Sequence, residues 1–204
     1  MTQPRKSSTT LRQGLHALAA SQGGYFTASQ ATEVGYDRRR FSYHVEAGNF
    51  ERAGHGLYRL TTLPLSEHDQ LVRLSLWSRG RDDQPQAVIS HETALGLHDL
   101  GELIPSTTHL TVPRAFRKRS MKGVVFHTGT VPAEDRSHRE GFDTTSPLRT
   151  LLDVAAGSTV PQEQLDKAVA EGLDRGMVRK SKLLAAIRNN PRLTRLALSL
   201  KNQR

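Results

Sequence analysis

The sequence predicts an α+β protein, and three observations lead to this class. The chain has 204 residues, a length that favours one or two domains. Hydrophobic residues make up 36% of it and the mean hydropathy is −0.53, values typical of a soluble globular protein with modest cores. Segments with apolar residues at helical spacing alternate along the chain with short apolar runs, so both helices and strands are expected.

Two short helices around a glycine turn form the first clear pattern. A capping residue, Thr27 or Ser29, opens a helix that continues to residue 34. Gly35 follows, and its backbone freedom suits a sharp turn between two helices. Asp37 is then a natural cap for a second, basic helix over residues 38–47.

A short hairpin follows these helices. The segments 50–53 and 57–60 flank a glycine-histidine-glycine turn at residues 54–56. A basic helix behind a glycine turn, followed by a basic hairpin, is the arrangement in which a winged helix-turn-helix reads a major groove and touches the backbone with its wing. The sequence therefore predicts a winged helix-turn-helix DNA-binding domain over residues 1–64, including a basic N-terminal arm.

The predicted basic helix has two faces. Phe41, His44 and Val45 fall on one face, which we expect to pack on a helix over residues 11–20. Arginine can pair with guanine through two hydrogen bonds, and serine or tyrosine can reach bases or phosphates. The residues expected at base edges are Arg39, Ser42 and Tyr43. Those expected at phosphates or in the minor groove are Arg38, Arg40, Thr27, Gln30, Arg52, His55 and Arg59.

Residues 65–204 are expected to form a second, α+β domain with a small sheet packed by several helices. Ser146 and Pro147 have the order of a helix cap and first helical residue. The predicted strands cover residues 87–89, 109–113 and 124–128. The predicted helices cover residues 66–78, 90–101, 146–156, 161–175, 180–189 and 192–200.

Positive charge is concentrated near the C-terminus. The net charge is +9, and residues 175–204 alone hold nine Lys or Arg and no acid, so the rest of the chain sums to zero. Basic amphipathic helices of this kind can dock an acidic partner or lie along DNA. The alternative is a helix pair packed on its own domain with a solvated basic face. The candidate partner-binding residues are Arg114, Arg117, Lys118, Arg119, Arg179, Lys180, Lys182, Arg188, Arg192 and Arg195.

Composition and motifs argue against an enzyme, a cofactor or a metal site. Cysteine is absent, which excludes disulfides and thiolate chemistry and fits a cytoplasmic protein. No apolar run approaches the roughly 18 residues of a membrane span, and the polar N-terminus is not a signal peptide. The nine histidines lack the spacing of a metal motif, and no phosphate-binding glycine loop appears.

Two local groups are interpreted as structural. Ser90, His91 and Asp99 could be imagined as a hydrolase triad, but no G-x-S-x-G turn is present and Ser90 is better explained as a helix cap. Asp153 lies on an otherwise apolar helix face, and Arg149, one turn earlier, is its expected partner.

Four strings carry a resemblance to a known family: GHGLYRL, AVISHETALGLHDLG, THLTVP and TTSPLRTLLDVAA, in this order. With them the chain resembles the AbiEi antitoxins of bacterial type IV toxin–antitoxin systems. The resemblance implies a cytoplasmic, non-enzymatic antitoxin whose N-terminal domain represses its own operon at inverted-repeat operator DNA, with two copies per operator. It also implies that the second domain neutralises a co-encoded nucleotidyltransferase toxin.

The same N-terminal arrangement also precedes nuclease-like domains in other proteins, but this chain has no Asp…Glu-x-Lys arrangement for a metal-dependent nuclease. Two alternatives stay open from the residues alone. The chain could be a stand-alone winged-helix transcriptional regulator, or a protein-interaction module that does not bind DNA.

Overall fold

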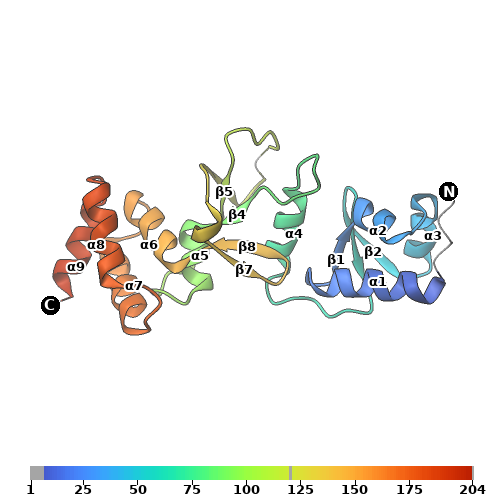
Figure 1. Cartoon of the computed structure of the whole chain (residues 1–204), viewed down its shortest axis with the longest axis horizontal. Helices are drawn as coiled ribbons and strands as arrows, with labels where there is room; N and C mark the ends of the chain where they lie inside the picture. Colours follow the sequence, from blue (N-terminus) through green and yellow to red (C-terminus); the bar gives the residue numbers. More distant parts are fainter. Residues whose placement is uncertain (1–6, 120, 204) are drawn as a thin grey trace. The chain divides into compact units, whose positions relative to one another are not determined.

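The structure, a computed structural model, describes residues 7–119 and 121–203 and has the α+β class that the sequence predicts (Figure 1). It divides into two compact units. The N-terminal unit comprises the described residues up to Gln86 together with His138–Phe142, and the C-terminal unit comprises Ala87–Ser137 and the residues from Asp143 onward. The predicted domain boundary after residue 64 stays a prediction. The first part of the predicted basic arm, residues 1–6, lies outside the described residues.

The N-terminal unit combines helices with a three-stranded antiparallel sheet in the order β1-β3-β2. Strand β1 was not expected, because three residues are too few to show a pattern. Its pairing with β3 ties the start of the second helix to the hairpin. The elements are α1 (Ser8–Ala20), β1 (Tyr25–Thr27), α2 (Ala28–Val34), η1 (Arg38–Arg40), α3 (Phe41–Glu46), β2 (Phe50–Gly54), β3 (Leu57–Leu60) and α4 (Asp69–Trp77).

Capping chemistry sets the bounds of α2. The Thr27 hydroxyl accepts from the Gln30 amide at 3.1 Å, and the Gln30 side chain accepts from the Thr27 amide at 2.9 Å, which completes a capping box. At the other end Gly35 has φ 122°, a conformation that residues with a Cβ rarely adopt, and the chain turns there.

The basic helix predicted over residues 38–47 is wrong in form. Asp37 does act as a cap, since its carboxylate accepts from the Arg39 amide at 3.0 Å. However, Asp37 caps only a single 3-10 turn, because the backbone of Arg40, with φ −97° and ψ 4°, is not α-helical. An α-helix of six residues, α3, then begins at Phe41. The three arginines therefore lie on a separate, tighter turn in front of α3.

Aromatic rings fill the core of the N-terminal unit. Phe26 meets Phe50 edge-on at 4.9 Å, and Phe41 meets Tyr58 edge-on at 5.2 Å. Phe41 belongs to the same buried cluster as the α1 side chains, as expected from the helical wheel. His44 stacks on Phe50 at 4.7 Å, so it is a packing residue.

A five-stranded mixed sheet in the order β6-β5-β4-β8-β7 belongs mainly to the C-terminal unit, apart from the residues of β7 and β8 within His138–Phe142, and α6 to α9 follow it in the chain. The three predicted strands are present. The sheet has two further strands, β7 and β8, that were not predicted, because their sequences, RSHR and FDTT, are short and polar. The elements are β4 (Val88–Ile89), α5 (His91–Leu97), β5 (Thr108–Val112), β6 (Val124–Thr128), η2 (Ala133–Asp135), β7 (Arg136–Arg139), β8 (Phe142–Thr145), α6 (Pro147–Ala156), α7 (Gln162–Asp174), α8 (Lys180–Asn189) and α9 (Thr194–Asn202).

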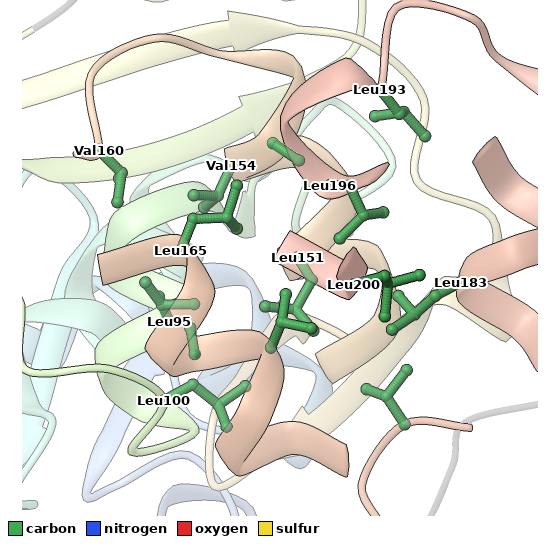
Figure 2. Packing of buried hydrophobic residues seen from close by; sticks show 14 residues of the cluster. Leu95, Leu100, Leu151, Val154, Val160, Leu165, Leu183, Leu193, Leu196 and Leu200 are labelled. Carbon is green, nitrogen blue, oxygen red and sulfur yellow. The ribbon is translucent and has the colours of Figure 1, made fainter. Parts of the chain in front are cut away.

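Helices α5 to α9 enclose an aliphatic core, shown in Figure 2. Leu95, Leu151, Leu165, Leu183 and Leu196, one from each helix, are fully buried in it. Burial of a leucine side chain contributes about 1.5–3 kcal/mol, so this cluster is a main source of the unit's stability. Among the described helices, none is both long and apolar enough to cross a membrane.

Candidate nucleic-acid interface

The 3-10 turn and α3 present a basic, exposed surface. The side chains of Arg38, Arg39 and Arg40 are exposed, and none of them forms an ion pair within the described chain. The Tyr43 side chain is 57% exposed, and the Arg40 guanidinium lies 5.7 Å from the centre of its ring. Ser42 is exposed beside them. The candidate base-contacting residues are thus solvent-accessible at one short turn and helix.

The β2–β3 hairpin is fixed to the start of α2. The Ala28 amide, the first of α2, donates to the Gly56 carbonyl in the hairpin turn at 2.8 Å. Gly56 has φ 66°, which suits glycine at this turn. Arg52 and His55 are both exposed on the hairpin, and a register shift between Arg52 and Gly54 bends β2. The hairpin and α2 therefore hold the wing candidates in one place.

Three of the candidate DNA contacts have structural partners instead. The Arg59 side chain is only 14% exposed and donates to Glu51 at 3.0 Å and to the Leu63 carbonyl at 2.8 Å. Gln30 is 9% exposed, and its amide is engaged by the capping box with Thr27 and by Gln22 at 2.9 Å. Both side chains therefore already take part in hydrogen bonds that hold the start of α2.

Most basic partner-binding candidates of the C-terminal unit are exposed. Those in the loop between β5 and β6 are Arg114, Arg117, Lys118 and Arg119. Those on or beside α8 are Arg179, Lys180, Lys182, Arg188 and Arg192. Arg195 differs from the rest, because it donates to the Gly157 carbonyl at 2.6 Å, to the Val160 carbonyl and to Gln162 at 3.2 Å. Arg195 therefore holds the loop between α6 and α7 against α9.

The structure also assembles a buried histidine–carboxylate cluster that the sequence did not predict. Glu92 is 5% exposed, and its Oε2 lies 2.8 Å from Nδ1 of His109. The same Nδ1 lies 2.9 Å from Nε2 of His127, and Thr159 donates to the other oxygen of Glu92. The His91 ring stacks on His127 at 3.4 Å. His109 and His127 lie on the adjacent strands β5 and β6.

The side chain of Ser90 is hydrogen-bonded to this histidine–carboxylate cluster through His91. Ser90 does occupy the N-cap position of α5, as the sequence predicts, but its side chain makes no capping hydrogen bond. Instead Thr111 donates to the Ser90 oxygen at 2.8 Å, and the Ser90 hydroxyl bonds Nδ1 of His91 at 2.9 Å. Ser90 is completely buried, so a substrate could not reach it as a nucleophile. His91 has φ 52°, a rare conformation for a residue with a Cβ.

The environment fixes the charges in this cluster. Burial, together with the neighbouring His127, lowers the pKa of His91 to about 4. Burial also lowers the pKa of His127. Burial alone would raise the pKa of Glu92, but the bonds from His109 and Thr159 outweigh it and lower the pKa to about 2. At neutral pH the cluster therefore holds a carboxylate next to neutral His91 and His127.

Within residues 7–119 and 121–203, no group of three or more His, Asp or Glu side chains is arranged to hold a metal ion. The expected pair on α6 does form, with Arg149 Nε 2.8 Å from Asp153 Oδ1. Arg149 also reaches Asp135 at 3.0 Å, and burial raises the pKa of Asp153. The contact between Arg149 and Asp135 joins α6 to η2, so Arg149 has a structural role.

One family model is similar to the N-terminal part of the chain, and one solved structure is similar to most of it. A family model described as "Transcriptional regulator, AbiEi antitoxin" matches residues 15–61. The crystal structure of the RV2827C protein from Mycobacterium tuberculosis is similar, with a TM-score of 0.57, 16% identity, and coverage of 96% of this chain and 78% of that chain. At this identity the likeness shows a shared fold alone. A comparison with curated proteins found no match. The predicted resemblance to the AbiEi antitoxins is thus confirmed over residues 15–61, the segment that contains α2, α3 and the hairpin.

Proposed function

We propose that this chain is a DNA-binding transcriptional regulator and antitoxin of the AbiEi type, and that its N-terminal unit is a winged helix-turn-helix. One observation carries the proposal. Three consecutive exposed arginines, which form no ion pair with any described residue, precede a helix that exposes Tyr43, and these residues lie inside the segment matched by the family model. An uncompensated basic turn of this kind is what a phosphate backbone attracts.

In the proposed complex, α3 and the turn before it enter a major groove. Arg39, Ser42 and Tyr43 contact base edges, while Arg38 and Arg40 hold phosphates. Arg52 and His55 on the hairpin touch the adjacent backbone or minor groove. Thr27, Gln30 and Arg59 support this surface from within the fold, in agreement with their hydrogen bonds. Two copies of the chain bind one inverted-repeat operator.

The first experiment is a binding titration on the DNA upstream of the chain's own gene and on scrambled DNA of equal length, at two salt concentrations. We expect binding to the upstream fragment to survive salt that removes the scrambled one. Equal and salt-sensitive binding to both would favour a protein-interaction module with nonspecific charge.

A variant sharpens this titration. Arg39→Ala should weaken specific binding by about 1–3 kcal/mol and relax preference at one base position. Arg81→Ala removes an exposed arginine outside α3 and the hairpin and is the matched control. Equal weakening of specific and scrambled DNA by Arg39→Ala would make Arg39 a phosphate contact and contradict the assigned helix register.

We further propose that the chain neutralises a co-encoded nucleotidyltransferase toxin in the cytoplasm, without acting as an enzyme. This part rests on the family resemblance. Co-expression tests it directly: the gene adjacent to this one should arrest growth when induced alone and should not when this chain is present. If the neighbouring product is harmless, or stays toxic in the presence of the chain, the chain is a regulator without antitoxin activity.

A further inference from the structure

A hollow in the N-terminal unit has no part in the proposed function. Its volume is about 440 Å³, within the roughly 300–1,000 Å³ of pockets that hold small molecules. Side chains of α1, α3, β2 and β3 line it, together with the turn that contains Tyr36. All of them belong to the N-terminal unit, so the hollow is formed within one compact unit.

Buried apolar side chains line part of this hollow. Leu15 of α1 is 1% exposed and Phe50 of β2 is 3% exposed. Leu60 of β3 packs against the same buried cluster and also lines the hollow. A ligand in contact with these side chains would remove apolar surface from water, which favours binding.

Two partly buried rings form a corner in the wall of the hollow. The rings of Tyr36 and His44 have centres 5.5 Å apart and planes inclined at 69°. A flat ring can therefore lie face to face with one of them and edge-on to the other, the two arrangements that aromatic pairs favour. His44 also stacks on Phe50 at 4.7 Å, so the core holds this corner in place. The shape favours a planar aromatic ligand.

The polar groups of the hollow favour an anion. Among the described residues that line it, none is Asp or Glu, whereas Arg12 and His16, one turn apart on α1, both line it. Arg12 is exposed and forms no ion pair with a described residue. Burial raises the pKa of Tyr36 and the charge of Arg12 opposes this rise, which places the guanidinium near the aromatic corner. The side-chain amide of Asn49 adds a neutral donor.

We propose that this hollow binds a small planar aromatic anion, with its ring in the corner of Tyr36 and His44 and its carboxylate at Arg12. The inference goes beyond the proposed function, because it uses the core-facing side of α3 and needs no DNA. A ligand in this place touches α1 and α3 at the same time, so its binding stabilises the folded N-terminal unit.

The probe is naphthoate, and the test is an NMR titration of the isotope-labelled full chain followed through its backbone amides. We expect saturable shifts at the amides of Tyr36, His44 and Asn49, with a dissociation constant of about 1 mM or tighter for a ligand of this size. Naphthamide, the neutral compound of the same shape, should bind about threefold to tenfold more weakly. Acetate, an anion without a ring, should leave these amides unshifted at the same concentration.

Variants locate the site. Arg12→Gln should weaken naphthoate binding by about threefold to tenfold and leave naphthamide binding unchanged. Arg81→Gln removes an exposed arginine outside the hollow and is the matched control. Tyr36→Leu removes one wall of the corner and should weaken both compounds. Thermal unfolding checks that each variant is folded, and naphthoate should raise the unfolding temperature of the unaltered chain.

Several results would overturn the inference. Equal affinity for naphthoate and naphthamide would do so, and so would equal losses in Arg12→Gln and Arg81→Gln. Acetate shifts at the same amides would show a nonspecific anion contact and count against it equally. Absence of naphthoate binding, together with weaker DNA binding by Arg12→Gln, would assign Arg12 to the DNA complex and also overturn it.

The outcome is separate from that of the proposed function. If the chain shows no preference for its upstream DNA, the operator proposal fails. Naphthoate binding that depends on Arg12 and Tyr36 would still support the inference.

Discussion

Protonation of His91 should make the fold sensitive to mild acid. Burial, together with neighbouring His127, lowers the pKa of His91 to about 4 in the folded chain, against about 6.5 for a histidine in an unfolded chain. Glu92 opposes this effect, while His109 and Arg149 add to it. Between pH 6.5 and pH 4 the unfolded chain therefore binds a proton that the folded chain does not. Stability contributed by neutral His91 is present above this window and is lost as the pH falls through it.

The magnitude follows from the two pKa values. Between pH 7 and pH 4.5, the difference between about 4 in the folded chain and 6.5 in the unfolded chain removes about 2 kcal/mol of unfolding free energy. His91→Asn removes the titrating ring. Asparagine tolerates the left-handed backbone at φ 52°, so this variant should fold, and its stability should lack the pH dependence that His91 contributes.

Urea unfolding followed by circular dichroism at several pH values measures this effect. The unaltered chain and His91→Asn should differ at pH 7 by a fixed amount, and the difference should change by about 2 kcal/mol by pH 4.5. His55→Asn, in the exposed hairpin turn, is the matched control. If the unfolding free energies of the unaltered chain and of His91→Asn differ by the same amount from pH 7 down to pH 4.5, burial of His91 does not control its protonation.

Three other substitutions test single contacts by urea unfolding at pH 7. The bonds that lower the pKa of Glu92 from 4.5 to about 2 imply a loss of about 3 kcal/mol in Glu92→Gln, and no loss would mean that the cluster is not formed. Arg195→Ala should cost about 2 kcal/mol and Arg192→Ala less than about 0.5 kcal/mol; equal losses would contradict the bonds of Arg195 to the α6–α7 loop. Thr27→Ala should cost about 1 kcal/mol through the lost cap of α2, whereas Thr27→Ser should keep that stability.

Local chemistry made much of the fold predictable. Capping by Thr27 and Asp37 and the turn at Gly35 depend on neighbours within a few residues, and the structure has them. The long helices of the C-terminal unit were predicted from apolar spacing for the same reason. The break at Arg40 was not predictable, because a basic run has no signal that separates a 3-10 turn from an α-helix.

The elements that sequence reasoning missed depend on distant partners. Strand β1 exists because β3, which begins at Leu57, pairs with it. The burial of Gln30 depends on Gln22, and the side chain of Arg59 is taken up by Glu51 across the hairpin. The histidine cluster joins positions 91, 109, 127 and 159, whose proximity no local spacing reveals.

The histidine cluster also determines how β6 aligns with β5. His109 and Thr111 lie opposite Val125 and His127, so their side chains share the sheet face that meets the first turn of α5. A slip of one residue would turn β6 over and bring Phe126 to the place of His127. Such a slip would cost the hydrogen bond between the two imidazoles beside the Glu92 carboxylate. Apolar side chains at these positions would allow either alignment of β6 at similar energy. The hydrogen-bonded side chains of the cluster favour one alignment, so misaligned β5–β6 pairs are disfavoured while the sheet assembles.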